Sequence, residues 1–348
     1  MKKLILLIFA YVIFSSHDMF LKMGTYFLNP NTPSTIKLYN GTFDKSENII
    51  ARTRMQDVSL VGNGTRTRVD SNLWSEMNNI TILNFNSGEA GTWVAGVSTT
   101  ANSIELNAQD FNEYLDHDGV LDMLNWRKEN NAMEEDAIEK YSKHVKAIFQ
   151  VGDKNTEDWK TVLGYPIEFV PTSNPYHFHS GDDFSAHLLL NGQPLADQLV
   201  YVGSDTQDHG HTHDEGEGHD HDDGHSHDND EASSHDHDDG DDGHAEEHQH
   251  NATQLTTDEN GMVTFTPDHE GQWYLRTIYM ETVEDAELTH ESNWATLTFE
   301  IGHGHSHGEA ISQTTETAGG MPNYIYWLGG IVMLLLVIIL MKRKNSAQ

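Results

Sequence analysis

Residues 209–250 form a stretch that a hydrophobic core cannot accommodate. Its sequence is HGHTHDEGEGHDHDDGHSHDNDEASSHDHDDGDDGHAEEHQH, with twelve histidines, no lysine or arginine and no large apolar side chain. Such a composition buries too little apolar surface to offset the conformational entropy lost on ordering, so we predict a disordered insertion at residues 205–252. The hexapeptide HDHDDG begins at both His219 and His235, which indicates a partly duplicated unit.

The chemistry of this insertion favours the binding of divalent transition metals. Imidazole suits nickel, zinc, cobalt and copper alike, and carboxylate oxygens can complete a coordination shell. Because imidazole binds metal only when it is neutral, we expect affinity to fall as the pH drops through roughly 6–7. An inert acidic linker is the alternative interpretation. The candidate ligands are His209, His211, His213, His219, His221, His225, His227, His235, His237, His244, His248 and His250, with His303, His305 and His307 in a second small cluster, GHGHSHG.

The rest of the composition narrows the classes of partner. The formal net charge is -35; 18 of the 55 acidic residues lie within residues 205–250, which leaves 37 acidic against 20 basic residues elsewhere. This balance disfavours nucleic acid and anionic lipid as partners and is compatible with cations. The chain has no cysteine, so a metal site must use histidine, carboxylates, methionine, backbone atoms or a free amine.

Both ends of the chain carry targeting signals. Lys2 and Lys3 precede an apolar run and two serines, which predicts a signal peptide over residues 1–16, cleaved after Ser15 or after Ser16. Residues 324–341 carry no charge, and as a helix they would measure about 27 Å, enough to span a bilayer core. Aromatic residues at the start of this run and basic residues after it predict a single-pass transmembrane helix. The linker before it covers residues 302–323, and the tail, residues 342–348, is expected in the cytoplasm.

Between these ends, the patterning predicts a mainly β protein with two antiparallel β-sandwich domains of immunoglobulin-like or prealbumin-like type. Alternating apolar and polar residues with Gly, Asn and Pro punctuation predict the first sandwich over residues 17–106 and the second, which holds the insertion, over residues 151–301. Residues 107–150 are rich in Leu, Met, Glu, Lys and Ala, which predicts a joining segment of two or three helices. The last helix is expected to be EEDAIEKYSKHVKAIFQ, with His144 on its surface.

A co-linear set of strings gives the chain a family resemblance. HDMFL just after the signal, IELNAQDFNEYL, YSKHVKAIFQVG, PIEFVPTSNPY, TDENGMVTF and WATLTFEI together resemble domain-of-unknown-function family 4198, a secreted bacterial family linked to nickel uptake. The resemblance implies β-sandwich domains and a periplasmic or surface protein associated with transition-metal transport. It supplies no agreed catalytic set, so only His17 and Asp18 carry over as a possible metal site.

His17 is a candidate metal ligand because the predicted cleavage would place it at or next to the free N-terminus. If Ser16 becomes the first residue, the free amine, the His17 amide nitrogen and the imidazole could chelate one square-planar Ni(II) or Cu(II) ion. If His17 is first, its amine and imidazole would form a brace of the kind seen in copper proteins with an N-terminal histidine. A histidine that merely follows the cleavage site is the alternative to both.

Other histidines are weaker candidates. His177 and His179, expected on a strand, would share one face and could bind a single metal, or they could be half-buried sheet residues. Asp116, His117 and Asp118 are expected at a solvated turn between helices. His187 is expected to be a partly buried strand residue, and His290 with Glu291 is a further possibility.

No nucleophile motif, phosphate loop or carboxylate pair stands out, so we predict a protein that is not an enzyme. The leading hypothesis is an anchored protein outside the bacterial cell membrane that binds or buffers a divalent metal, nickel first, beside a membrane transporter. A surface interaction module with the insertion as a spacer is the alternative, and a copper oxidase with a histidine brace is a third.

Overall fold

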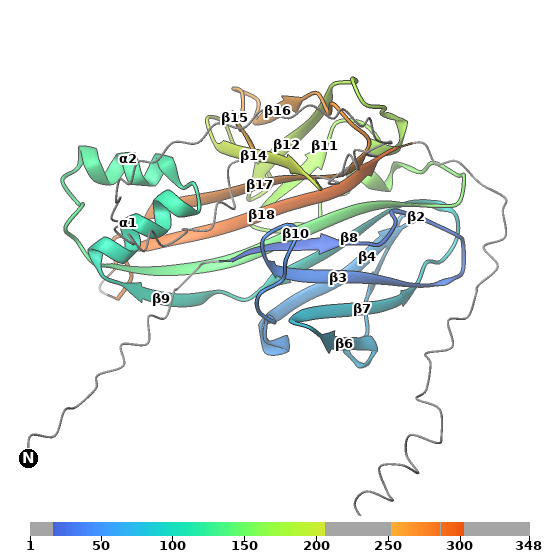
Figure 1. Cartoon of the computed structure of the whole chain (residues 1–348), viewed down its shortest axis with the longest axis horizontal. Coiled ribbons are helices and arrows are strands. Elements are labelled where there is room, and N and C mark those ends of the chain that lie inside the picture. Colours follow the sequence, from blue (N-terminus) through green and yellow to red (C-terminus); the bar gives the residue numbers. More distant parts are fainter. Residues whose placement is uncertain (1–16, 206–251, 286, 303–348) are drawn as a thin grey trace, which may run out of the picture. The chain divides into compact units, whose positions relative to one another are not determined.

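One ten-stranded sheet runs through the whole described part of the molecule (Figure 1). The computed structural model describes residues 17–205, 252–285 and 287–302. The sheet is built on β10 and β18, two long strands that pair in parallel from Glu139 opposite His290 to Ala147 opposite Thr298. In order, its strands are β15 (Thr253–Thr256), β14 (Leu199–Ser204), β17 (Gly271–Thr282), β18 (His290–Ile301), β10 (Ala137–Val151), β8 (Gly91–Thr99), β4 (Met55–Gly62) and β5 (Thr65–Arg68), with β2 (Phe27–Leu28) and β9 (Asn102–Leu106) also paired to β10.

Two smaller sheets complete the β architecture. The first contains β1 (Asp18–Lys22), β3 (Pro33–Gly41), β7 (Ile80–Asn86) and β6 (Trp74–Met77), in that order. The second contains β11 (Ile167–Pro171), β12 (Phe184–Leu190), β13 (Gln193–Pro194) and β16 (Met262–Phe265). Each smaller sheet shares a hydrophobic cluster with the large one, the first through residues such as Leu38 and Phe149 and the second through residues such as Phe169 and Leu297. The two sandwiches therefore have one sheet in common.

Two short α-helices cover one end of the large sheet (Figure 1). Helix α1 spans Ala108–His117 and α2 spans Leu121–Glu129. The Asn107 side chain caps α1 by accepting a hydrogen bond from the backbone N–H of Asp110, as the sequence predicts. The apolar face of α1 packs against Trp294 and Ile278 of the sheet. Four 3₁₀ turns lie elsewhere: η1 (Arg52–Arg54), η2 (Ser71–Leu73), η3 (Glu157–Lys160) and η4 (Pro175–His177).

The expected third helix is wrong, because residues 137–151 form the long strand β10. Lys, Glu and Ala are good helix formers, but intrinsic helix propensity is a small free energy per residue, and strand pairing with neighbours on both sides overrides it. From Lys143 onward the strand lies between hydrophobic clusters on its two faces, so the polar residues there are buried as well. His144, expected on the surface, is only 2 % exposed, and its ring nitrogens contact the hydroxyls of Ser98 and Ser142 at 2.9 and 3.0 Å.

The prediction of a mainly β protein is thus confirmed. The predicted separation of two sandwich domains by a helical segment is not. The predicted first and second sandwiches share hydrogen bonds through β10 and β18, and the described residues between His17 and Gly302 fall into a single compact unit by their contacts. The reason is the length of β10, which carries 15 residues and reaches across both sandwiches.

Several predictions concern residues outside the described ranges. They are the signal peptide (1–16), the histidines of 209–250, the cluster at His303, His305 and His307, the linker, the transmembrane helix at 324–341 and the tail. Within the described ranges, none of the helices has the length and apolar character that crossing a membrane requires.

Burial of His144 should make the stability of the fold depend on pH. Burial lowers the pKa of His144 from 6.5 to about 4. As the pH falls from 6.5 towards 4, the unfolded chain takes up this proton and the folded chain does not, so stability is lost. We expect His144→Gln to reduce the stability lost between pH 7 and pH 4.5 by about 2 kcal/mol, measured by urea denaturation. His187→Gln, at a partly exposed position on β12, should keep the wild-type pH dependence; equal curves for all three proteins would contradict the assignment.

Candidate functional site

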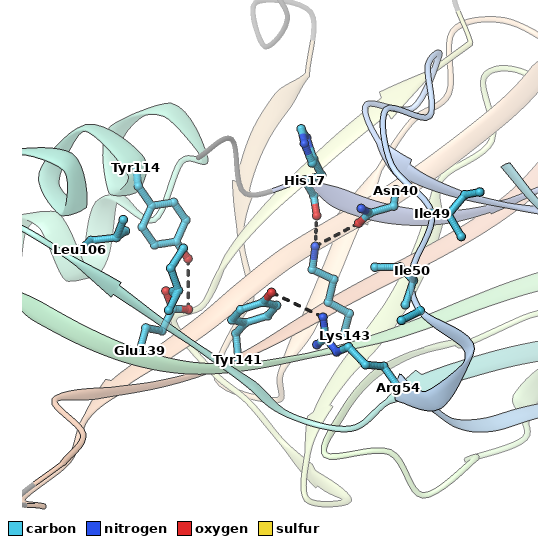
Figure 2. Close-up of a pocket in the computed structure, with 12 residues that line it drawn as sticks. His17, Asn40, Ile49, Ile50, Arg54, Leu106, Tyr114, Glu139, Tyr141 and Lys143 are labelled. Atoms are coloured by element: carbon cyan, nitrogen blue, oxygen red, sulfur yellow. Dashed lines mark hydrogen bonds between the residues drawn. The ribbon is translucent and has the colours of Figure 1, made fainter. Parts of the chain in front are cut away.

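A cavity of about 350 Å³ lies where the end of the first small sheet, helix α1 and strand β10 meet (Figure 2). Its polar lining comes from elements far apart in the sequence, and its apolar lining from two short segments. The lining residues are His17, Asn40, Ile49, Ile50, Ala51, Arg54, Ile104, Leu106, Tyr114, Glu139, Tyr141 and Lys143. His17, from the predicted mature N-terminus, is the one sequence-predicted site residue that this cavity includes.

Strand β10 supplies the floor of the cavity. Glu139, Tyr141 and Lys143 occupy alternate positions, and side chains at such positions project from the same face of a strand. Further along this face, Val145 and Ala147 enter the hydrophobic cluster shared with the first small sheet. The cavity is therefore the point at which the sandwich interior opens and polar residues replace apolar ones.

Lys143 is a buried cation at the centre of the site. Lys143 is 4 % exposed, and burial lowers the pKa of its amine to about 8. The Nζ donates to the backbone carbonyl of His17 and lies 3.3 Å from Asn40 Oδ1. It also lies 4.7 Å from the centroid of the Trp294 ring, which stabilises the charge.

Arg54 brings a second cation to the same cavity. Its guanidinium lies 5.1 Å from the centroid of the Tyr141 ring and donates to Tyr141 Oη at 3.5 Å and to the Thr100 carbonyl at 3.2 Å. Its Nε is buried without a hydrogen-bond partner among the described residues. Within the same residues, neither Arg54 nor Lys143 forms an ion pair with a carboxylate.

Glu139 lies towards the helical end of the cavity. It accepts hydrogen bonds from Tyr114 Oη at 3.2 Å and from the Ser292 hydroxyl, and Trp294 Nε1 donates in turn to Ser292 Oγ at 3.1 Å. Burial raises the pKa of the Glu139 carboxyl to about 7, although these donors oppose the shift. The carboxyl is therefore only partly ionised near neutral pH.

His17 lies just before β1 and faces the acidic side chain of Glu47. The Nδ1 of His17 is 3.1 Å from Glu47 Oε2. Burial lowers the pKa of the imidazole, with Lys143 adding to the effect, while Glu47 opposes it. The ring is therefore mostly neutral near pH 7, which is the form that binds metal.

Asp18 is engaged elsewhere. Its carboxylate forms an ion pair with Arg276 of β17, and both side chains are largely buried, at 15 % and 5 % exposure. Arg276 also donates to the backbone carbonyl of Asp118 at 2.6 Å. Asp118 was expected at a solvated turn, but it is 3 % exposed, because the turn after α1 packs against this arginine. Its carboxylate pairs with His117 Nδ1 at 2.8 Å and raises the pKa of that imidazole.

The expected strand around His177 and His179 is wrong. Asn174 caps the 3₁₀ turn η4 and Pro175 opens it, which ends extended structure there. His177 Nε2 contacts Asn155 Nδ2 at 2.7 Å, and His179 Nδ1 lies 3.5 Å from Asp182 Oδ2.

Two other histidines lie on strands. His187 is partly buried on β12, as expected, and His290 is 4 % exposed at the start of β18. Within the described ranges, no three His, Asp or Glu side chains are grouped so that they could hold a metal ion.

Most residues of this site were not predicted from the sequence. Glu47, Arg54, Glu139, Tyr141 and Lys143 were not singled out. The spacing Glu-x-Tyr-x-Lys is the signal that could have found three of them, had the segment been predicted as a strand.

The fold and the cavity define a class: a mainly β protein in which two sandwiches share one long sheet and enclose a polar cavity at its end. The chain belongs to the family described as a domain of unknown function, DUF4198, whose model matches residues 14–281. The family membership predicted from the sequence is thereby confirmed. No curated protein matches the chain.

Solved structures give only distant likenesses. Trypsin-activated alpha-2-macroglobulin from Escherichia coli is 10% identical, with 82% of this chain and 16% of that chain covered and a TM-score of 0.19. A DUF4785 family protein from Legionella pneumophila is 9% identical, with coverage of 52% and 37% and a TM-score of 0.20. The chain spans well under two thirds of each, and at these TM-scores the likenesses support no argument about fold or function.

The Asp18–Arg276 pair should be important for stability. Removing one partner of a buried ion pair leaves the other charge buried without compensation, so we expect Asp18→Ala to destabilise the fold by about 3 kcal/mol. The exposed Arg52–Glu76 pair, at 2.9 Å, is the control, and Glu76→Ala should cost less than about 1 kcal/mol. Urea denaturation of the metal-free protein measures both; equal losses would show that the Asp18 pair contributes no more than a surface pair.

Proposed function

We propose that the protein binds and buffers a divalent transition metal, nickel first, outside the cytoplasmic membrane, and that it supports metal uptake by a membrane transporter. The observation that carries this proposal is the density of imidazoles: twelve within residues 209–250, with carboxylates and no cation among them. Zinc, cobalt and copper remain alternative metals, since imidazole binds all of them.

The fold supports the proposal by the way it presents the insertion. β14 ends at Ser204 and β15 begins at Thr253, and these strands pair directly, with Val202 opposite Thr253. The insertion therefore leaves and re-enters the sheet at neighbouring positions on β14 and β15. Its length can vary without changing strand order or core packing, so a ligand-rich segment of this size is compatible with the family fold.

His17 and Glu47 offer a second, more defined site. Two ligands held about 2.0 Å from a metal at right angles lie about 2.8 Å apart, and the observed distance between Nδ1 and Oε2 is 3.1 Å. With the free amine of a processed N-terminus, these groups would supply three or four ligands to one ion. The nearby charge of Lys143 opposes cation binding, whereas Glu47 favours it, so we propose that this site holds one ion at most.

Nickel titration of the full-length protein by calorimetry near pH 7.5 tests the insertion. If two to four imidazoles share each ion, we expect about three to six ions per chain. Two variants should lose most of them: one with residues 206–251 replaced by a short Gly/Ser turn, and one with the twelve histidines changed to Asn. The second keeps every carboxylate and so separates imidazole binding from simple acidity. Fewer than one ion per wild-type chain would refute the proposal.

The site at His17 is tested in a variant that lacks residues 206–251 and in which His303, His305 and His307 are changed to Asn. After N-terminal sequencing has established the mature first residue, we expect one nickel ion per chain. His17→Ala should abolish this binding and Glu47→Gln should weaken it roughly tenfold, about 1.4 kcal/mol. His187→Ala is the control and should have no effect. A deletion variant that binds no nickel would exclude His17 as a ligand and leave the insertion as the metal-binding element.

A further inference from the structure

The cavity at the end of the shared sheet has the size of a site for one small molecule. Its volume of about 350 Å³ falls at the lower end of the range for ligand pockets, about 300–1,000 Å³. Its walls come from strands β3, β9 and β10, from helix α1 and from the segment that ends in the 3₁₀ turn η1. A rigid frame of this kind holds its side chains in place without a ligand.

Two cations in the cavity have no ion-pair partner among the described residues. Among the described residues, the Nζ of Lys143 lies next to neutral oxygens of Asn40 and of the His17 backbone and over the rings of Trp294 and Tyr141. Arg54 donates to neutral oxygens and keeps a buried Nε unpaired. Burying charge without a counter-charge is costly, so the site is built for an anion.

Asp18, Asp118 and Glu139 act on Lys143 at a distance and raise the pKa of its amine against the effect of burial, but among the described residues none of them forms an ion pair with Lys143 or Arg54. Asp18 is paired to Arg276, and Asp118 pairs with His117. Glu139 is four residues from Lys143 along an extended strand, which places their Cα atoms about 13 Å apart at 3.3 Å per residue. The carboxylate of Glu139 also already accepts two hydrogen bonds. An anion in the cavity would add the direct ion-pair contact that both cations lack among the described residues.

The remaining walls are apolar. Ile50, Ile104 and Leu106 line the cavity, and Ile49 at its edge is 38% exposed, one of few large apolar side chains exposed in the described ranges. Figure 2 shows Ile49 and Ile50 on the side of Arg54, and Leu106 on the side of Tyr114. An inorganic anion would leave this apolar surface uncovered, whereas an organic one would bury it.

We propose that this cavity binds a small organic carboxylate, with its carboxylate group on Lys143 and Arg54 and its apolar part against Ile50, Ile104 and Leu106. Arg54 can offer its unpaired Nε together with a neighbouring N–H, and Lys143 acts as a second donor. This binding goes beyond the proposed metal function and does not depend on it, because none of these contacts requires a metal ion.

Isosteric probe pairs test the proposal on full-length, metal-free protein. Benzoate, hexanoate and 3-phenylpropanoate are titrated by calorimetry and ligand-observed NMR, each beside its neutral amide. We expect at least one acid to bind in the millimolar range or tighter, and its amide to bind roughly tenfold more weakly or worse, because charge-assisted hydrogen bonds are lost. If no acid binds at millimolar concentration, or if acids and amides bind equally, the proposal is overturned.

Variants then place the carboxylate. Arg54→Gln and Lys143→Gln should each weaken binding of the acid roughly tenfold or more and leave the amide unchanged. Arg52→Gln, on the same 3₁₀ turn but outside the cavity, and Lys160→Gln, on an exposed turn, are matched controls and should bind as wild type. Arg54 is partly exposed, so Arg54→Gln keeps the test valid if Lys143→Gln fails to fold; wild-type affinity in Arg54→Gln overturns the assignment.

Failure of this proposal and failure of the metal function can be told apart. The variant without residues 206–251 should lose most of its bound nickel and keep benzoate binding, whereas Arg54→Gln should bind benzoate roughly tenfold more weakly and keep its nickel. If carboxylate binding required added nickel, the metal would be the anion's partner and the role of the two cations would be refuted.

Discussion

The structure depends on one constraint, the burial of charged side chains in the strand that both sandwiches share. β10 is covered on both faces over this stretch, yet it carries Lys143 and Lys146, which are 4 % and 1 % exposed. Lys146 is neutralised by Glu168, at 2.9 Å, and both side chains are only 1% exposed. Because a buried charge without a partner is so costly, this pair fixes how β11 sits against β10.

The same carboxylate organises the chain before β11. Glu168 accepts backbone hydrogen bonds from Leu163, Gly164 and Tyr165 at 2.8 to 3.2 Å, and Lys146 also donates to the carbonyls of Thr161 and Phe169. Every polar requirement of this ion pair is thus met locally. Three positions earlier on β10, Lys143 has no such carboxylate, and that contrast within one strand is what distinguishes a structural lysine from a candidate ligand-binding one.

Sequence patterning was a good guide to class and a poor guide to this strand. The first and last regions alternate clearly, since most of their strands have one face in a core and one nearer solvent, and the mainly β prediction followed. β10 shows little alternation in polarity because both of its faces are buried and its charges are satisfied by tertiary partners. Its Lys, Glu and Ala content therefore led to the prediction of a helix. With that prediction, His144 was expected on the surface, and the common face of Glu139, Tyr141 and Lys143 on a strand was not recognised.

Other parts of the site could be inferred only in outline. The position of His17 after a predicted signal peptide made it a candidate, and the structure places it at the cavity. Its neighbour Glu47 is distant from any motif, and only the pairing of β1 with β3, which brings Asp18 opposite Gly41, carries the chain near it. A contact that depends on strand register and on a loop between strands leaves no periodic signal in the sequence.

The two proposed sites also make opposite electrostatic demands on one chain. The acidic excess of the chain attracts cations and repels anions at long range, but screening limits that effect to about 8–10 Å at physiological salt. Inside the cavity, Lys143 and Arg54 act at direct contact in a medium of low polarity, where an interaction is several times stronger than in water. A small carboxylate that reaches them therefore responds to the local pair of cations rather than to the net charge. Cation binding by the histidine-rich insertion and anion binding by the cavity are physically compatible in this protein.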